Sequence, residues 1–323
     1  VKSDSALSLN GQSLRISVDK SGVTIAGAKV TVTDIECSNG IIHVIDTVMM
    51  PSTSTIVETA IEAGNFTTLA AALGAADLVD TLQGKGPFTV FAPTDEAFAA
   101  LPKGTLESLL DPKNKATLTS ILTHHVVAGR VSSASVVKMN NAAALSGQRL
   151  GIRVGENGVM IGGSKVAVTD IQCKNGTIHV IDTVMLPSSR DIVETAVAAG
   201  TFNTLVAAVG AGGLAGVLQG DGPFTVFAPT DEAFAALPKG TVESLLLPEN
   251  KAKLVAILKY HVVSGRVYSD QLSNGDVATL GGSKVKVSLR KNESFINEAK
   301  VTAADIQTTN GVIHVLNKVL LPN

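Results

Sequence analysis

One stretch of the sequence, residues 86–105, recurs without a single change as residues 222–241. The interval between the two copies is 136 residues, and the same interval separates the two cysteines, Cys37 and Cys173. A period of this length is the size of a whole domain, whereas solenoid repeats have periods of about 20–50 residues. The chain of 323 residues is therefore predicted to contain tandem copies of one domain.

The repeated stretch predicts a strand, a sharp corner and a short helix. Residues 88–92 are apolar on both faces of an extended chain, which indicates a buried strand. Thr94 follows Pro93, and its hydroxyl can accept a hydrogen bond from the first turn of a helix. The carboxylates of Asp95 and Glu96 suit the positive end of that helix. The stretch is interpreted as a core-forming corner, and the next helix is predicted to be capped by Thr105.

A β-rich half of the domain occurs three times, and a helical half occurs twice. Each β-rich half carries an Asn-Gly turn between two apolar runs, which is a strong hairpin signal. Each helical half opens with a capping-box pattern, in which a cap residue is followed three residues later by glutamate. These patterns are Thr55 with Glu58 and Asp191 with Glu194.

The order of these halves predicts the domain boundaries. Residues 1–51 form the C-terminal, β-rich half of a domain, whereas residues 52–187 and 188–323 form two complete domains. The linkers are almost absent, which predicts a stiff array. A small sheet without covering helices leaves its apolar face in water. The first segment therefore either belongs to a longer array or is covered by another chain.

Two motifs and one residue pair resemble the signature of the fasciclin I-type domain. The first motif is matched by residues 88–98 and 224–234, and the second by residues 39–46, 175–182 and 310–317. The pair is Tyr260-His261, and the middle copy has His124-His125 instead. This resemblance implies an α+β fold in which each domain is a β-wedge of two small sheets with several short helices.

The resemblance also implies a function. It implies a non-enzymatic extracellular or cell-surface protein of adhesion and matrix assembly, whose partners are copies of itself or cell-surface and matrix components. In animal members of the family, an Asp-Ile pair before the second motif and the Tyr-His region are associated with integrin adhesion. The matching residues are Asp34, Ile35, Asp170, Ile171, Asp305, Ile306, Tyr260 and His261.

Two further interpretations stay open at this point. Identical surfaces repeated along a stiff chain can support the contacts of a filament or sheath. Alternatively, the chain is a secreted binding module for a glycan or a small lipid, which requires a sizeable apolar pocket between the wedge and the helices.

The histidines are predicted to be structural. Those in the repeated β-rich half are expected to bond to the backbone within the sheet, and they are His43, His179 and His314. His125 and His261 lie where a helix passes into a strand, which again favours a structural hydrogen bond. His124 and His125 make a poor metal pair because adjacent side chains point apart. Without a nucleophile elbow or a phosphate loop, no catalytic residue, cofactor or metal is predicted.

The composition and the remaining motifs limit the partners. The chain has 26 Lys and Arg against 28 Asp and Glu without a basic run, which argues against nucleic acid. No apolar run reaches about 18 residues, so no membrane span is predicted.

The two cysteines are expected to be free thiols, the alternative being a bond between neighbouring chains or domains. Three glycosylation patterns begin at Asn65, Asn175 and Asn292. Asn317 replaces the Asp of the other copies, so that carboxylate is not expected to do chemistry.

Overall fold

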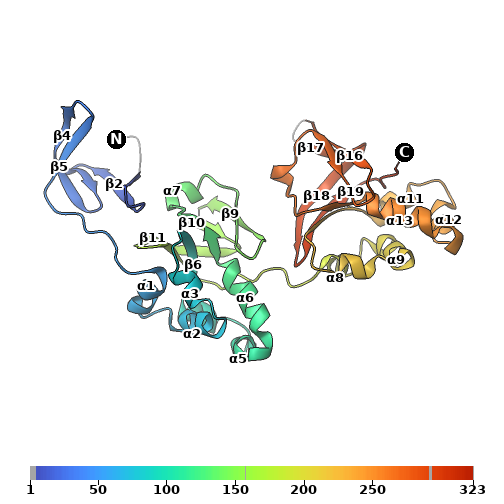
Figure 1. Ribbon diagram of the computed structural model, residues 1–323, viewed down its shortest axis with the longest axis horizontal. Coiled ribbons are helices and arrows are strands. Elements are labelled where there is room, and N and C mark those ends of the chain that lie inside the picture. Colours follow the sequence, from blue (N-terminus) through green and yellow to red (C-terminus); the bar gives the residue numbers. More distant parts are fainter. Residues whose placement is uncertain (1–4, 157, 291–292, 323) are drawn as a thin grey trace. The chain divides into compact units, whose positions relative to one another are not determined.

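The computed structural model describes residues 5–156, 158–290 and 293–322. The chain divides into two compact units, Val1–Pro187 and Ser188–Asn323 (Figure 1). The first unit holds a separate N-terminal sheet followed by a helical and β-rich part, residues 52–187, which we call the middle domain. The second unit is called the C-terminal domain.

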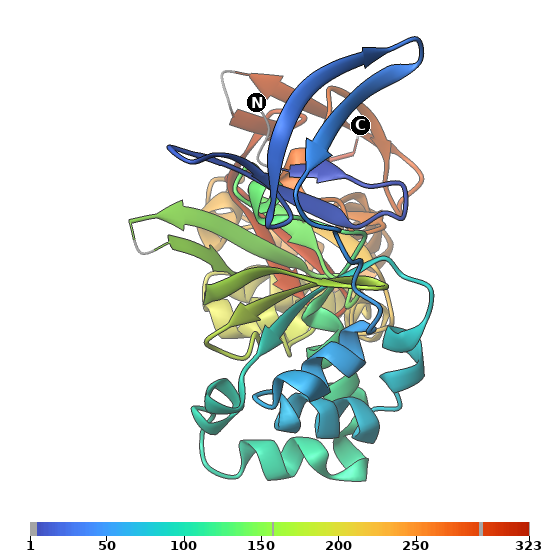
Figure 2. The same cartoon turned by 90° about the vertical axis from the view of Figure 1, so that its left-hand side faces the viewer.

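The N-terminal sheet has five antiparallel strands in chain order. Its longest hairpin is formed by the fourth and fifth strands, which the predicted Asn-Gly turn connects (Figure 2). The strands are β1 (Ser5–Leu7), β2 (Ser13–Asp19), β3 (Gly22–Ile25), β4 (Ala28–Cys37) and β5 (Gly40–Ile45).

The middle domain begins with helices and ends with strands, as the repeat predicts. Its helical half contains α1 (Ile56–Ala63), α2 (Thr67–Ala75), α3 (Val79–Gln83), β6 (Phe88–Pro93), α4 (Asp95–Ala99), α5 (Thr105–Leu110), α6 (Lys115–His124), β7 (Val126–Ala128) and α7 (Ser133–Val136). Its β-rich half contains β8 (Asn141–Ala143), β9 (Arg149–Gly155), β10 (Gly158–Ile161), β11 (Ser164–Cys173) and β12 (Gly176–Ile181).

The C-terminal domain repeats this order. Its helical half contains α8 (Ile192–Ala199), α9 (Asn203–Gly212), α10 (Ala215–Leu218), β13 (Phe224–Pro229), α11 (Asp231–Ala235), α12 (Thr241–Leu245), α13 (Lys251–Tyr260) and β14 (Val262–Ser264). A 3-10 turn, Ser269–Gln271, stands where the middle domain has α7. The remaining strands are β15 (Gly275–Ala278), β16 (Lys284–Arg290), β17 (Glu293–Ile296), β18 (Ala299–Thr308) and β19 (Gly311–Leu316).

The sheet of each domain joins the two halves. The strand order in the middle domain is β7-β6-β12-β11-β10-β9-β8, and the C-terminal domain has the equivalent order. The buried strand of the repeated stretch, β6, lies parallel to β12 and antiparallel to β7. The predicted α+β class is confirmed. The two expected small sheets are continuous, because the ten-residue strand β11 takes part in both and changes register between Val166 and Ile171.

The helix starts follow the local signals with one exception. Both predicted capping boxes are formed, at Thr55 with Glu58 and at Asp191 with Glu194. The Thr94 hydroxyl accepts a hydrogen bond from the Ala97 N–H at 3.3 Å, which confirms that cap. The cap predicted at Thr105 is wrong, because α5 already begins at that residue and the backbone of Gly104, with φ of 82°, precedes it.

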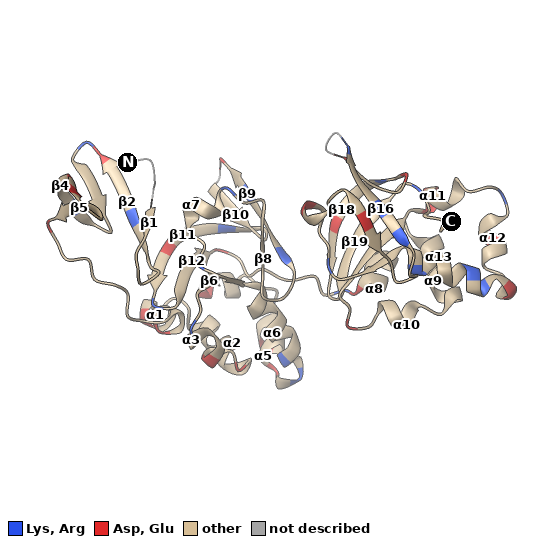
Figure 3. Ribbon diagram, turned by 45° about the horizontal axis from the view of Figure 1, so that its top comes forward, with Lys and Arg blue, Asp and Glu red and all other residues tan. Residues whose placement is uncertain are grey.

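Each complete domain has two apolar clusters, one between the helices and the sheet and one in the β-rich half. In the middle domain the first includes Phe66, Leu69 and Leu122, and the second includes Phe91 and Leu150. Charged residues of both signs are interspersed along the described chain (Figure 3). Among the described residues, no helix is both long enough and apolar enough to cross a membrane.

Candidate functional site

The Asp-Ile pairs lie at a backbone irregularity of the longest strands. The pairing register of β11 with β12 shifts between Val168 and Ile171, and β4 and β18 shift at the same place. The aspartates at this point have left-handed backbones, with φ of 59° at Asp34, 61° at Asp170 and 62° at Asp305. Aspartate is among the few residues with a side chain that adopt this conformation readily.

The carboxylate of this aspartate is used inside each complete domain. Asp170 accepts hydrogen bonds from the backbone N–H of Ser133, at 2.9 Å, and from the Ser133 hydroxyl. Asp305 does the same for Ser269, with a backbone distance of 2.8 Å. The carboxylate therefore holds the start of α7, or of the matching 3-10 turn, against the sheet. Asp34 is exposed in the N-terminal sheet.

The histidine nine residues after each aspartate completes this arrangement. In the middle domain the Asp170 N–H donates to His179 Nδ1 at 3.2 Å, and His179 Nε2 bonds to the Val131 carbonyl at 2.9 Å. The ring is therefore neutral with its proton on Nε2, and burial lowers its pKa. His314 has the same contacts with Asp305 and Val267. The predicted backbone bonds of these sheet histidines are confirmed.

The Tyr-His pair forms hydrogen bonds with other residues than the Asp-Ile pair. The Tyr260 hydroxyl donates to the Lys284 carbonyl at 2.9 Å and accepts from the Asn297 amide at 3.1 Å. Its side chain is buried. In the middle domain the corresponding His124 bonds to the Ser146 hydroxyl at 2.9 Å, and burial lowers its pKa to about 4.

His261 is fully enclosed and bonded at both ring nitrogens. Nδ1 bonds to the Ile257 carbonyl at 2.8 Å, so it carries the proton, and Nε2 accepts from the Leu320 N–H at 2.9 Å. Burial lowers the pKa of His261 to about 4. His125 makes the equivalent bonds to Ile121 and Met185 and has the same lowered pKa. These structural hydrogen bonds were predicted, and they fasten the end of a helix to the last segment of its domain.

The asparagine of the second motif has a role that the sequence did not disclose. Asn175 accepts from the Ile56 N–H at 2.9 Å and donates to the carbonyls of Leu82 and Gly84 at 2.7 and 2.9 Å. Asn310 makes the equivalent bonds in the C-terminal domain. Its recurrence in all three copies was the available signal. A glycan on Asn175 would break this buried clamp; Asn65 is exposed, and Asn292 lies outside the described residues.

Asp95 also does more than the helix dipole explains. Its carboxylate accepts hydrogen bonds from the backbone N–H groups of Thr67 and Thr68, at 3.2 and 2.7 Å. It therefore caps α2, which has no side-chain cap from its own preceding residue. The Thr68 N–H is the largest cause that lowers the pKa of Asp95 to about 2. Asp231 makes the corresponding bonds.

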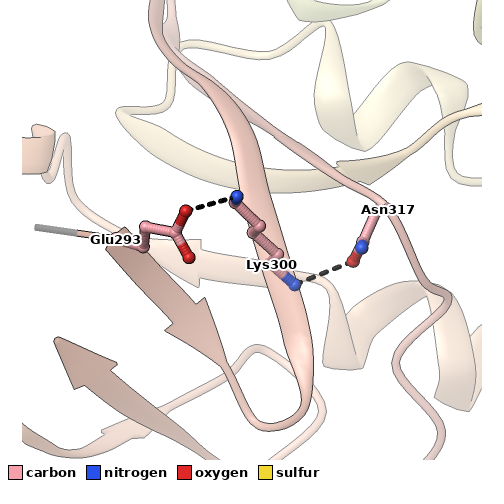
Figure 4. Close-up of polar contacts among 3 residues, drawn as sticks. All are labelled: Glu293, Lys300 and Asn317. Atoms are coloured by element: carbon pink, nitrogen blue, oxygen red, sulfur yellow. Dashed lines mark hydrogen bonds and ion pairs between the residues drawn. The ribbon is translucent and has the colours of Figure 1, made fainter. Parts of the chain in front are cut away.

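The Asp-to-Asn difference between copies is also structural. Asn317 Oδ1 accepts from the backbone N–H of Lys300 at 2.8 Å, and the Lys300 ammonium pairs with Glu293 at 2.6 Å (Figure 4). Asp182 accepts from the Lys165 N–H in the same way at 2.9 Å. An amide oxygen therefore replaces the carboxylate oxygen at this position.

The described residues contain no group of three or more His, Cys, Asp or Glu side chains that could hold a metal ion. No disulfide joins Cys37 and Cys173 within the chain, and the two residues differ in exposure. Cys37 is exposed and Cys173 is buried, and burial raises the pKa of the Cys173 thiol. The Asp, His and Asn side chains that recur between the domains thus bond to their own domain.

Comparison with known proteins finds relatives in Synechocystis and in animals. Protein sll1483 of Synechocystis sp. is 47% identical over 165 residues, which cover 51% of this chain and 91% of that protein. Transforming growth factor-beta-induced protein ig-h3 of Sus scrofa is 32% identical over 317 residues, which cover 97% of this chain and 45% of the relative. Human periostin is 30% identical over 305 residues, which cover 93% of this chain and 35% of periostin. The chain spans less than half the length of these two animal relatives.

Among solved structures, the FAS1 domain pair of the insect cell adhesion molecule fasciclin I has a TM-score of 0.41 and 18% identity, covering 81% of this chain and 98% of that one. The profile of the Fasciclin domain matches residues 1–51, 64–187 and 200–322. These matches cover most of the sequence, so the chain belongs to the fasciclin domain family, with two tandem domains and a further partial copy at residues 1–51.

Proposed function

We propose that the chain is an extracellular, non-enzymatic structural or adhesive protein that binds its partners through the outer surfaces of its domains. One observation carries this proposal: the polar side chains that recur between the copies form hydrogen bonds within their own domain. Asp170, Asn175 and His179 all bond to their own domain. Such residues stabilise the fold, so partners are left to the exposed side chains and loops around them.

The carried-over adhesion residues differ in how far a partner can reach them. Tyr260 and His261 are buried, so they act on a partner only by supporting the surface above them. Ile35 is 41% exposed, and Ile171 and Ile306 are partly buried. We therefore assign direct contact with a cell-surface partner to the isoleucines of the Asp-Ile pairs. A filament or sheath built from such domains is a finer form of this proposal and stays a prediction.

Cell attachment to surfaces coated with the chain tests the adhesive role. Replacing Ile171 and Ile306 together by alanine is expected to lower attachment several-fold, because the contact surface of both domains is reduced. Both side chains also pack against the apolar clusters of their domains, so slow Cys173 labelling and an unchanged tyrosine signal must show that the variant is folded. The control is Val154→Ala, which shortens an exposed apolar side chain of β9. The proposal is wrong if the unaltered chain supports no attachment, or if the control lowers attachment as much as the double variant.

We also propose that residues 1–51, 52–187 and 188–323 are one β-rich half and two complete domains. The face of β4 and β5 supports this division. Ile42 and Val44 are 51% and 40% exposed, whereas their counterparts in β12, Ile178 and Val180, are 1% and 5% exposed beneath the helical half. In this proposal, the exposed apolar face of the N-terminal sheet is equivalent to the face that the helical half covers in the middle domain.

Thiol labelling tests this division directly, because Cys37 and Cys173 occupy equivalent positions. Cys37 is expected to react with a thiol reagent at least tenfold faster than Cys173. Attaching a further copy of residues 52–136 ahead of Val1 restores the repeat register and should reduce Cys37 labelling to the Cys173 rate. Unchanged labelling of Cys37 in the extended chain, with its Cys173 still protected, would contradict the division.

A further inference from the structure

The C-terminal domain contains an apolar cavity between its helices and its sheet. The cavity has a volume of about 50 Å³. Helices α8, α9, α10 and α13 line one side of the cavity, and strands β13 and β19 line the other. Ile192, Val209, Leu218, Val226 and Ile313 are among the lining residues. The inner surface is thus almost entirely aliphatic.

Two polar side chains reach this lining, and neither offers a free group to the interior. Both ring nitrogens of His261 are already bonded, to the Ile257 carbonyl and the Leu320 N–H. Lys259 lies on the exposed side of α13, at the rim. An apolar cavity without polar partners stays dry and binds small apolar molecules.

The middle domain has the same cavity in a smaller form, with a volume of about 20 Å³. Each of its lining residues has a counterpart in the lining of the larger cavity. One of these pairs is Leu73 against Val209, so the C-terminal cavity has a smaller side chain in its wall. The middle domain therefore provides a smaller cavity with an equivalent lining, with which the C-terminal cavity can be compared.

The rim of the larger cavity also differs from that of the smaller one. Val206 and Val217 line it where the middle domain has Ala70 and Thr81, and Val217 is 51% exposed. Lys259 stands at the position of Thr123. The lining of the C-terminal cavity therefore adds two valines and one exposed lysine, and the middle domain has no charge at the equivalent position.

We propose that this cavity binds a medium-chain fatty acid. The methyl end of the chain enters between Val209 and Ile313, the following methylenes lie over Val206 and Val217, and the carboxylate lies beside the Lys259 ammonium. The enclosed volume is about a third of the ~150 Å³ cavity that accepts benzene in an engineered protein, so it takes the end of an alkyl chain and not a ring. The opposite charges fix the direction of the chain.

Titration with octanoate, followed by the methyl NMR signals of the intact chain, tests this site. Saturable shifts are expected at Val209 and Ile313. Val209→Leu copies the middle domain and is expected to weaken binding at least tenfold without unfolding the domain. The reciprocal change, Leu73→Val, is expected to produce new shifts at Ile178.

A second pair of probes tests the role of the charge. Lys259→Thr, which also copies the middle domain, is expected to weaken octanoate binding several-fold and to leave binding of 1-octanol unchanged. The proposal is overturned if octanoate shifts none of these methyl groups up to its solubility, if Val209→Leu binds as well as the unaltered chain, or if the lysine variant loses affinity for neither or for both ligands equally.

Discussion

Replacing Gly176 by alanine is expected to unfold the middle domain or to destabilise it by at least about 3 kcal/mol, the upper range for overpacking. A Cβ at this position would lie 2.1 Å from the Phe88 carbonyl oxygen and 2.5 Å from Ile56 Cδ1. The first atom belongs to the backbone of β6, which pairs in parallel with β12 at this residue. The strand cannot move aside without losing that pairing.

Two native probes separate the domains in this experiment. Labelling of buried Cys173 reports opening of the middle domain, and it is expected to rise strongly in Gly176→Ala. The only tyrosines, Tyr260 and Tyr268, lie in the C-terminal domain and the chain has no tryptophan, so tyrosine fluorescence should show an unchanged unfolding transition there.

The matched control is Gly40→Ala in the N-terminal sheet. Gly40 is the counterpart of Gly176, yet a Cβ there meets no atom within 4 Å. We expect Gly40→Ala to change stability by less than about 1 kcal/mol, since it mainly restricts the unfolded chain. Equal effects of the two variants would contradict the explanation by strand packing.

Acidification from pH 6.5 to pH 4 is expected to lower the free energy of unfolding of the C-terminal domain by about 3 kcal/mol through His261 alone. Burial lowers the pKa of His261 to about 4 in the folded state, against an ordinary value of 6.5 for a histidine in water. Between these values the unfolded chain binds the proton and the folded domain does not. Stability therefore rises with pH across this window and is lost as the pH falls through it.

Urea unfolding followed by tyrosine fluorescence at several pH values measures this effect. His261→Gln removes the titrating ring, so the variant should be less stable at pH 7 and should lose much of the slope between pH 6.5 and 4. Burial also lowers the pKa of His314, which leaves a residual slope of the same sign. An identical slope in the two proteins would show that His261 is not the titrating group.

The local structure was predictable where interactions between residues close in the sequence determine it. The caps at Thr55, Thr94 and Asp191 follow from hydroxyl or carboxylate groups that bond within one helical turn. The hairpin turns at Asn175 and Asn310 follow equally from their Asn-Gly pairs. The repeat then extended each local prediction to the second domain.

The sites that bring distant residues together were not predictable in this way. The β6–β12 pairing joins Phe88 to Gly176, and the Asn175 side chain bridges Ile56 and Leu82. No periodicity within either segment specifies such a partner. From the sequence, the family resemblance implied that Asp170 is an adhesion residue. Its hydrogen bond with the Ser133 backbone is seen only in the folded domain.

The parallel insertion of β6 beside β12 also has a consequence for biosynthesis. Residues leave the ribosome in chain order, so β5 emerges before β6, and β6 emerges long before β12. Wherever the edge of β5 is unoccupied, a nascent β6 can pair with this equivalent but incorrect strand before β12 has been made. If another strand already paired with β5, this mispairing during translation of the tandem domains would be prevented.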